Sequence, residues 1–291
     1  MNHTAFGLII ESELELPELF ASNGQIDAAI VFGKVPEHLE TPVEKTPWFE
    51  VAGGKFLLRV DGIAKYYVEN GNMIVIDPEA GTNKEDVRVF LLNTVIAALL
   101  QQRDYLILHG SVALINGKAV ALVGPSRSGK TAIALSLYEK GYQILSDEIC
   151  AIKTKNGKVL IYPGIPQLNV WHDTLAAEGK NVSGCQPIRR GLEKFAFRVE
   201  DRFCRDAFEL SDIIFLKHHN KETMLSEALK GGEKLEHLLK NTYFVETTSD
   251  KVANFQVCGD AVNHANIMKV TFNNKLYQVD KLTNFIIKKL K

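Results

Sequence analysis

The sequence predicts an α/β (α+β) protein with two regions. Residues 1–82 are expected to form a small, mainly antiparallel β region, and residues 83–291 a mixed-sheet core built around a phosphate-binding loop. Three observations predict this class: short apolar runs separated by turn residues, a long apolar helix pattern after them, and a strand, a glycine loop and a helix in succession near the middle of the chain.

The first region consists of runs typical of strands, followed by one long helix. Asn70-Gly71 predicts a tight hairpin between the last two of the runs FGLII, AAIVFG, KFLLRV, AKYYV and MIVID. From Asn83, the stretch NKEDVRVFLLNTVIAALLQQR predicts a helix whose apolar second half indicates burial between two layers. This helix leads into the second region.

Two further Asn-Gly pairs, Asn116-Gly117 and Asn156-Gly157, predict hairpins in the second region. The first joins SVALI to AVALV, the strand before the glycine loop, whereas a dinucleotide-binding βαβ unit has no such antiparallel partner. The core sheet is therefore expected to be mixed. Further along we expect an exposed loop at Glu178–Pro187, a strand at ELSDIIFLKHH, two short helical stretches in LSEALKGGEKLEHLLKNT broken at Gly231-Gly232, and an amphipathic helix at LTNFIIKKLK.

Composition excludes several classes of protein. The 34 basic and 35 acidic residues nearly cancel, so no overall field favours nucleic acid or an anionic membrane as a partner. The N-terminal segment carries Glu11, Glu13 and Glu15 where a signal peptide is apolar, and no apolar stretch is long enough to span a membrane. The cysteines show no metal or disulfide spacing (Cys150, Cys185, Cys204 and Cys258). We expect a cytoplasmic protein.

The stretch GPSRSGKT, Gly124 to Thr131, fits the P-loop pattern G-x-x-x-x-G-K-[ST]. The apolar strand AVALV precedes it and a helix pattern follows, so backbone N–H groups and the helix N-terminus would face an anion. Lys130 would reach the terminal phosphates, and the Thr131 hydroxyl would bind Mg²⁺. The alternative is a glycine-containing turn with a surface lysine. The expected ATP-binding residues are Gly124, Ser126, Arg127, Ser128, Gly129, Lys130 and Thr131.

Asp147 and Glu148 end the strand that follows the P-loop helix. Ligands of open α/β sheets lie beyond the carboxyl ends of the strands, so at least one of these acids is expected within reach of Mg²⁺ or of a phosphate acceptor. The alternative is a helix cap or a solvated turn. His109 ends the strand YLILH, and its position alone favours a packing role.

A local excess of positive charge lies in PIRRGLEKFAFR. Such a segment near a nucleotide site could bind phosphates or a carboxylate of the acceptor, although a solvated charged face is the commoner explanation. The candidate substrate-binding residues are Arg189, Arg190, Lys194 and Arg198.

From Tyr105 to Ile152 the chain resembles the catalytic core of HPr kinase/phosphorylase: a His-Gly pair, a hairpin, the P-loop, its helix, and a strand that ends in two acids. The resemblance implies a fold similar to phosphoenolpyruvate carboxykinase. By this resemblance, Asp147 falls on the catalytic aspartate of the family and His109 on the histidine that neighbours it. Together with the P-loop lysine, the candidate catalytic residues are Asp147, His109 and Lys130.

Softer motifs across most of the chain look like the compact HPr kinase-like proteins of lasso-peptide biosynthesis, which phosphorylate the C-terminal serine of a precursor peptide. These motifs are FGLIIESELELPEL, EDVRVFLLNTVIAALLQQR, YPGIPQLNVWHDTL and RRGLEKF. One departure is Ile188, which stands where the Glu-x-Arg-Gly signature of the bifunctional HPr enzymes has glutamate. This departure argues against a metal-assisted reverse reaction and against HPr as the substrate. Another is Glu148, which replaces the usual second aspartate.

The predicted function is an ATP- and Mg²⁺-dependent kinase acting on a serine hydroxyl of a peptide or protein, most specifically a lasso-type precursor. Asp147 is expected to be the base, with Thr131 and Glu148 at the metal, although the residues alone leave open which of the two acids has which role. The alternatives are an HPr-type kinase, a kinase of free serine or another small molecule, and an ATP-binding regulatory protein without phosphoryl transfer. The oligomeric state stays open, and a homo-oligomer is compatible with the sequence.

Overall fold

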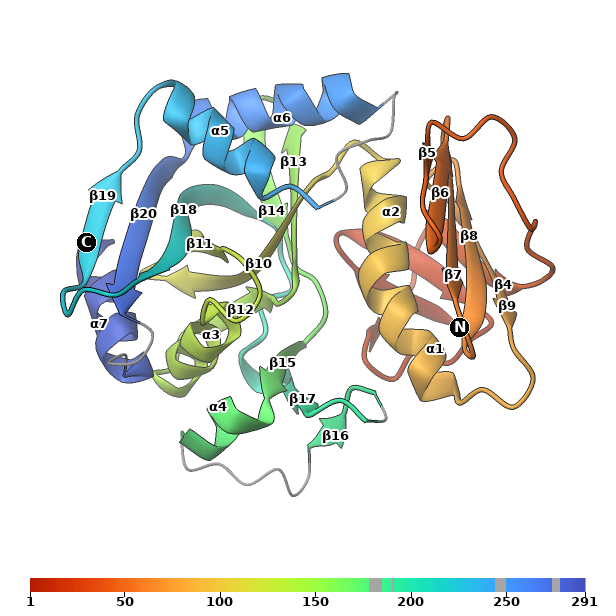
Figure 1. The fold of residues 1–291 in the computed structure, drawn as a ribbon, viewed down its shortest axis with the longest axis horizontal. Helices are drawn as coiled ribbons and strands as arrows, with labels where there is room; N and C mark the ends of the chain where they lie inside the picture. Colours follow the sequence, from red (N-terminus) through yellow and green to blue (C-terminus); the bar gives the residue numbers. More distant parts are fainter. Residues whose placement is uncertain (178–184, 190, 244–249, 274–277, 291) are drawn as a thin grey trace.

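The computed structural model describes residues 1–177, 185–189, 191–243, 250–273 and 278–290. Within these residues the chain forms two large sheets, a small third sheet, and helices that separate or cover them (Figure 1). The sequence-based prediction of a mixed α/β fold with an N-terminal β-rich region is confirmed. The proposed division at residue 82 stays a prediction.

Residues 1–78 form a nine-stranded sheet that is antiparallel except where β4 pairs with β2 and with β9. The predicted hairpin is present, with Asn70 at a φ of 53° and Gly71 at 64°. The run FGLII is a strand only from Leu8, because Phe6 and Gly7 form the turn before it. In sheet order the strands are β3 (Phe20–Ala21), β1 (Asn2–Ala5), β2 (Leu8–Ser12), β4 (Ala28–Phe32), β9 (Met73–Pro78), β8 (Ala64–Glu69), β7 (Lys55–Val60), β6 (Phe49–Ala52) and β5 (Glu44–Lys45).

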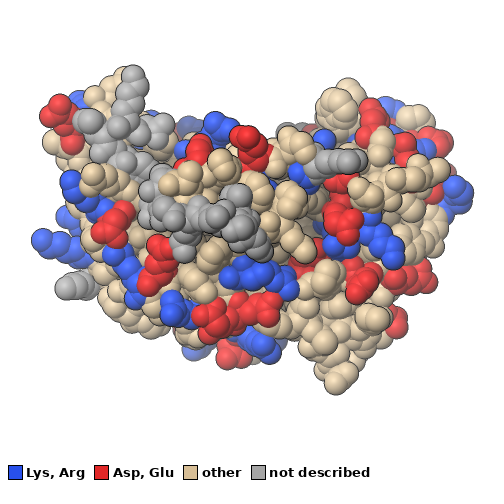
Figure 2. Space-filling view, turned by 90° about the horizontal axis from the view of Figure 1, so that it is seen from below, with Lys and Arg blue, Asp and Glu red and all other residues tan. Residues whose placement is uncertain are grey.

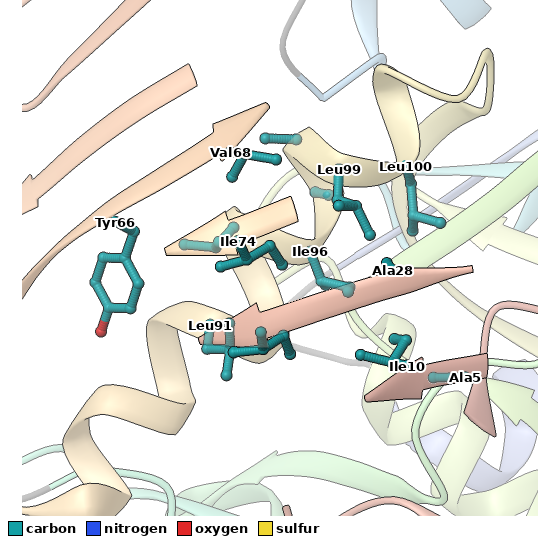
Figure 3. Packing of buried hydrophobic residues seen from close by; sticks show 14 of the residues in the cluster. Ala5, Ile10, Ala28, Tyr66, Val68, Ile74, Leu91, Ile96, Leu99 and Leu100 are labelled. Carbon is teal, nitrogen blue, oxygen red and sulfur yellow. The ribbon is translucent and has the colours of Figure 1, made fainter. Parts of the chain in front are cut away.

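A long helical segment follows and lies between this sheet and the rest of the molecule (Figure 1). It consists of α1 (Lys84–Phe90), a π-helical turn (Leu91–Val95) and α2 (Ile96–Gln101). Figure 3 shows its apolar side chains against those of the N-terminal strands, among them Leu91, Ile96 and Leu99. The predicted burial of this helix between layers is confirmed.

The core sheet has eight strands in the described residues and is mixed, as predicted. The P-loop strand β11 runs parallel to β18, and β18 runs parallel to β20, whereas β10, β12, β13 and β14 pair antiparallel with their neighbours. The strands are β10 (Leu106–Ile115), β11 (Lys118–Val123), β12 (Gln143–Ser146), β13 (Ile149–Lys155), β14 (Lys158–Tyr162), β18 (Phe208–His219), β19 (Leu225–Ala228) and β20 (Asn266–Asn273).

Helices cover both faces of the core sheet. The P-loop helix α3 (Lys130–Glu139) and the C-terminal helix α7 (Val279–Lys289) contribute to the apolar cluster on one face. The helices α5 (Gly232–Lys240) and α6 (Asp250–His264) contribute to the cluster on the other face. Among the described residues, no helix combines the length and apolar character needed to cross a membrane.

One element prediction was wrong. Residues Leu225–Ala228, expected to be helical, form the edge strand β19 antiparallel to β20. Pairing with β20, together with an ion pair from Glu227 to Lys269 at 2.7 Å, outweighs the weak helical propensity of so short a run. The stretch from Gly232 onward is helical, as predicted.

A small sheet that the sequence did not reveal lies beside the P-loop helix. It consists of β15 (Gln167–Trp171), β17 (Lys194–Arg198) and β16 (Gln186–Pro187), with the short helix α4 (His172–Ala177) after β15. The loop predicted at Glu178–Pro187 lies mostly outside the described residues, and its last two residues form β16. This sheet brings part of the basic segment toward the P-loop.

Candidate active site

The P-loop joins the end of β11 to the start of α3, as its sequence predicted. Gly129 has a φ of 90°, in the left-handed region that favours glycine, directly before the first residue of α3. A side chain at Gly124 would place its Cβ 2.8 Å from the carbonyl oxygen of Leu216 and 2.9 Å from Ser128 Oγ. Both glycines of the motif are therefore required by the backbone.

Polar groups of this loop suit an anion. Ser128 Oγ is buried and has no hydrogen-bond partner among the described residues. Lys130 is buried as well, and its Nζ donates to the carbonyl oxygens of Gly124 and Pro125, both at 2.9 Å. Burial lowers the pKa of Lys130, although Glu148 and Asp147 act in the opposite direction. An orphaned hydroxyl and a desolvated ammonium beside a helix N-terminus fit the phosphates of a nucleotide.

Asp147 lies in the turn between β12 and β13 and is only 8% exposed. Its carboxylate accepts hydrogen bonds from Ser111 Oγ at 2.6 Å, Thr131 Oγ1 at 3.0 Å and the backbone N–H of Asn169 at 2.8 Å. Burial, with Glu148 adding to the effect, raises its pKa to about 6, although the bonds from Ser111 and Asn169 act against the rise. A carboxylate with such a pKa can accept a proton near neutral pH.

Glu148 connects the acidic pair to His109. Its backbone has a φ of 68°, which is uncommon for a residue with a side chain and is often found at functional sites. Its carbonyl oxygen accepts from the N–H of Gly110 at 3.2 Å and lies 3.2 Å from His109 Nδ1. The side chain of Glu148 lies 3.6 Å from the same imidazole nitrogen. A proton on Nδ1 can be donated to the Glu148 carbonyl oxygen, which leaves Nε2 as the basic nitrogen of the neutral ring.

The glycine that follows His109 has no space for a side chain. A Cβ at Gly110 would lie 2.5 Å from the carbonyl oxygen of Leu122 and 2.7 Å from the sulfur of Cys150. Burial and the charge of Lys130 lower the pKa of His109, whereas Glu148 favours its protonated form. The His-Gly pair therefore places a mainly neutral imidazole close to the P-loop lysine.

The small sheet contributes Trp171 and Lys194 to this site. Lys194 Nζ forms an ion pair with Glu148 Oε1. The same ammonium lies 5.6 Å from the centre of the Trp171 ring, and the guanidinium of Arg127, in the P-loop, lies 4.7 Å from that ring. These contacts connect the P-loop, the small sheet and the acidic pair.

The other candidate substrate-binding residues contact different parts of the molecule. Arg198 donates to the carbonyl oxygen of Pro17 at 2.7 Å and pairs with Glu200 at 2.8 Å. The guanidinium of Arg189 lies 5.7 Å from the ring of Phe90 in α1. Arg190 lies outside the described residues. Among the described residues of this set, Lys194 contacts the acidic pair, whereas the contacts seen for Arg189 and Arg198 are to other parts of the molecule.

Oxygen ligands for Mg²⁺ are present in the same place. Thr131 and Asp147 are hydrogen-bonded, and Glu148 follows Asp147 directly. Hydroxyl and carboxylate oxygens are the ligands that Mg²⁺ prefers, and this ion usually keeps several waters and binds one or two carboxylates together with substrate phosphates. In the part of the chain that the structure describes, no group of three or more His, Cys, Asp or Glu side chains is arranged so that it could hold a metal ion by itself. The donors fit a Mg²⁺ ion shared with a nucleotide.

Sequence reasoning missed two groups that hold Asp147. Ser111 follows the His-Gly pair on β10, but a single serine in an apolar strand gives no functional signal. Asn169 contributes its backbone N–H, which is independent of residue type and became visible only with the position of β15.

Comparison with known proteins supports the resemblance to HPr kinases over part of the chain. Two HPr kinase/phosphorylases of Chlorobium phaeobacteroides match it, one at 41% identity over 56 residues (19% of this chain and 16% of the relative), and the other at 29% over 115 residues (39% and 32%). The HPr kinase/phosphorylase of Prosthecochloris aestuarii matches at 38% over 64 residues (22% and 19%). The chain therefore matches less than a third of the length of these relatives.

Among solved structures, the HPr(Ser) kinase/phosphatase from Coxiella burnetii aligns with 63% of this chain and 97% of its own, with 12% identity and a TM-score of 0.34. No family model matches the chain. The curated relatives confirm the predicted resemblance to HPr kinase/phosphorylase over the matched part of the chain, whereas the assignment to the lasso-peptide group stays a prediction.

Proposed function

We propose that this chain is an ATP- and Mg²⁺-dependent kinase that phosphorylates a serine hydroxyl of a peptide or protein. The observation that supports this most directly is the environment of Asp147. A buried carboxylate with a pKa of about 6 is hydrogen-bonded to Thr131 of the P-loop helix and lies next to a second acid. A proton acceptor would thus lie beside the position expected for the terminal phosphate of a nucleotide in the P-loop.

Each part of the site would have a defined task. The P-loop would hold the phosphates through backbone N–H groups, Ser128 Oγ and Lys130. Thr131, with Glu148 or Asp147, would hold Mg²⁺. Mg²⁺·ATP, when bound, supplies the phosphoryl group and the positive charge that stabilises its transfer. Asp147 would orient the acceptor hydroxyl and take its proton. A pKa of about 6 allows this at neutral pH without a further base.

Lys194 is the best candidate for a cation on the acceptor side. It lies on β17 above Trp171 and reaches the same acidic pair that would orient the acceptor. If the acceptor serine has a carboxylate next to it, that carboxylate could replace Glu148 as the ion-pair partner of Lys194. This favours a peptide that ends in serine, as in lasso-type precursors, because its terminal carboxylate belongs to the reacting residue. HPr, another protein, free serine and other small molecules are the competing acceptors.

A regulatory protein that binds ATP without transferring phosphate is the alternative of another class. Such a protein needs the P-loop but has no chemical need for a buried carboxylate of raised pKa next to it. The convergence of Ser111, Thr131 and Asn169 on Asp147 therefore favours the kinase.

Incubation with γ-labelled ATP and Mg²⁺ tests the proposal. The acceptors are a peptide ending in serine, the same peptide with an amidated C-terminus, HPr, and free serine. Label in the first peptide, with at least about a tenfold lower kcat/KM for the amidated form, supports a peptide kinase that recognises the terminal carboxylate. If label appears only in HPr or only in free serine, that molecule takes the place of the serine-ending peptide as the proposed acceptor. ATP binding without transfer to any of the four supports the regulatory protein.

A further inference from the structure

Tyr243 lies beside His109, far from it in sequence but adjacent in space. The two rings are 28° from parallel, and their centres are 6.4 Å apart. Burial raises the pKa of Tyr243, with the negative charge of Glu148 adding to the rise and the contact to Thr94 acting against it. Tyr243 therefore borders the proposed catalytic site on the side of the imidazole.

The backbone of Tyr243 is fixed to the strand that carries His109. Its N–H donates to the carbonyl oxygen of Ile107 at 2.8 Å, and the preceding residue, Thr242, forms an antiparallel bridge with Leu108. Its carbonyl oxygen accepts from the side chain of Gln101, at the end of α2, at 2.6 Å. Bonds to its N–H and to its carbonyl oxygen hold the backbone of Tyr243 in place beside β10.

The π-helical turn at Leu91–Val95 brings a third group to this tyrosine. Thr94, within the turn, has its Oγ1 3.4 Å from the Tyr243 hydroxyl. A π turn contains one more residue than an α turn, is rare, and is frequently found at functional sites. The extra residue changes which side chains of the helix face the core. In this turn, Thr94 is directed toward Tyr243, whose ring lies beside His109.

We infer that Tyr243 is a positioning residue that holds the imidazole of His109 in the orientation in which Nδ1 faces Glu148. This inference rests on the proposed kinase function for its effect on turnover. The ring limits rotation of the imidazole from one side, and the Glu148 carbonyl and carboxylate fix it from the other. His109 is then held close to Glu148, which favours the protonated imidazole, and in the field of Lys130 and Lys194, whose charges lower its pKa.

The ring and not the hydroxyl should carry this role, because the hydroxyl contact to Thr94 is long, at 3.4 Å, whereas the ring lies alongside the imidazole at 28° from parallel. Tyr243→Leu is expected to lower kcat about tenfold, the scale of a misoriented catalytic group, and to leave the KM for ATP within about twofold. Tyr243→Phe is expected to keep at least about half of the parent kcat. Tyr138→Leu, the same change at the far end of α3, is the control.

A double-mutant cycle with His109→Ala separates positioning from general packing. If Tyr243 acts through His109, Tyr243→Leu has no further effect on kcat in the His109→Ala background. Equal losses in both backgrounds, a loss that appears only in the KM for ATP, or failure of Tyr243→Phe to restore turnover would overturn the inference.

A second readout does not depend on activity. The ring protons of His109, assigned by comparison with His109→Ala, should lose an aromatic ring-current shift in Tyr243→Leu and keep it in Tyr243→Phe. Unchanged resonances in Tyr243→Leu overturn the contact itself. A parent protein that binds ATP and transfers no phosphate, but shows this shift, rejects the kinase proposal and keeps the placement of Tyr243.

Discussion

Replacing Asp147 with asparagine should make the metal-free protein more stable at neutral pH while it removes most of the activity. The carboxylate is buried, and its charge is disfavoured there. Asparagine has nearly the same shape and no charge. We therefore expect the two effects to have opposite signs, which a general loss of structure cannot produce.

The magnitude follows from the surroundings of Asp147. A pKa raised from 3.8 to about 6 corresponds to ~3 kcal/mol of unfavourable free energy for the charged form in the folded protein. The amide oxygen of asparagine can still accept from Ser111 and Thr131, but its NH₂ group then faces the N–H of Asn169, which costs about 1–2 kcal/mol. The net gain is about 1–2 kcal/mol, or roughly 2–4 °C in Tm for a chain of this size.

The sign of the pH dependence is the second part of this prediction. Between pH 3.8 and about 6 the carboxyl of the unfolded chain has lost its proton while that of the folded chain keeps it. The folded state then binds more protons, so the contribution of this group to the free energy of unfolding falls as pH rises through that window and is constant above it. The asparagine side chain of the variant does not titrate. The Tm difference between variant and parent should therefore grow from about pH 4 to about pH 7.

Thermal melts followed by circular dichroism in EDTA, across this pH range, measure the stability. Single-turnover transfer from labelled ATP measures the activity, which we expect to fall by about 100-fold or more. Calorimetry should find ATP·Mg²⁺ affinity within a few fold of the parent. If the variant is less stable than the parent at neutral pH and the Tm difference does not grow with pH, the conclusion that Asp147 is charged and buried at neutral pH is wrong. Loss of ATP·Mg²⁺ binding would give Asp147 the metal role and make Glu148 the candidate base.

Lys130→Ala should abolish transfer, because it removes the only P-loop ammonium and leaves the loop backbone intact; wild-type turnover in this variant would end the P-loop kinase proposal. Lys194→Ala should reduce the loss of kcat/KM that follows amidation of a serine-ending peptide, because Lys194 is the proposed partner of the terminal carboxylate. The control is Arg198→Ala, which removes a cation of the same strand that is bonded to the N-terminal region, and it should leave this loss unchanged. Equal losses in the two variants would mean that the basic segment is a solvated face. Gly110→Ala should destabilise the protein by about 1–3 kcal/mol, because its Cβ overlaps the carbonyl of Leu122, and an unchanged chemical-denaturation midpoint would contradict the packing of this pair.

The sequence was sufficient for the features that depend on neighbouring residues. The P-loop follows from GPSRSGKT and its flanks, and the Asn-Gly turns at Asn70, Asn116 and Asn156 all adopt positive φ values of 53°, 54° and 52°. Turn conformation and strand-loop-helix order are set within a few residues, so local chemistry decides them. The mixed sheet followed from the hairpin at Asn116 for the same reason.

Features set by distant contacts could not be predicted. Leu225–Ala228 became a strand because β20 offered a free edge, and nothing in the segment itself shows this. The basic segment looked like one site, yet residues four apart on a strand lie far from each other, so Lys194 meets Glu148 whereas Arg198 meets Pro17. Asn169 and Tyr243 reach the site only through the placement of β15 and of the segment beside β10.

The apolar cluster that joins the N-terminal sheet to the helix (Figure 3) continues into the core. Tyr105, Ile107, Ile149 and Tyr162 of the core belong to this cluster, and Ile107 and Ile149 stand two positions from His109 and Asp147. On the surface seen in Figure 2, by contrast, charges of both signs are mixed. The N-terminal sheet is therefore not a separate unit that could be exchanged or expressed apart. A fragment that begins at the helix would expose apolar side chains of this cluster to water, so trimming the chain to the P-loop region should give insoluble material rather than a minimal enzyme.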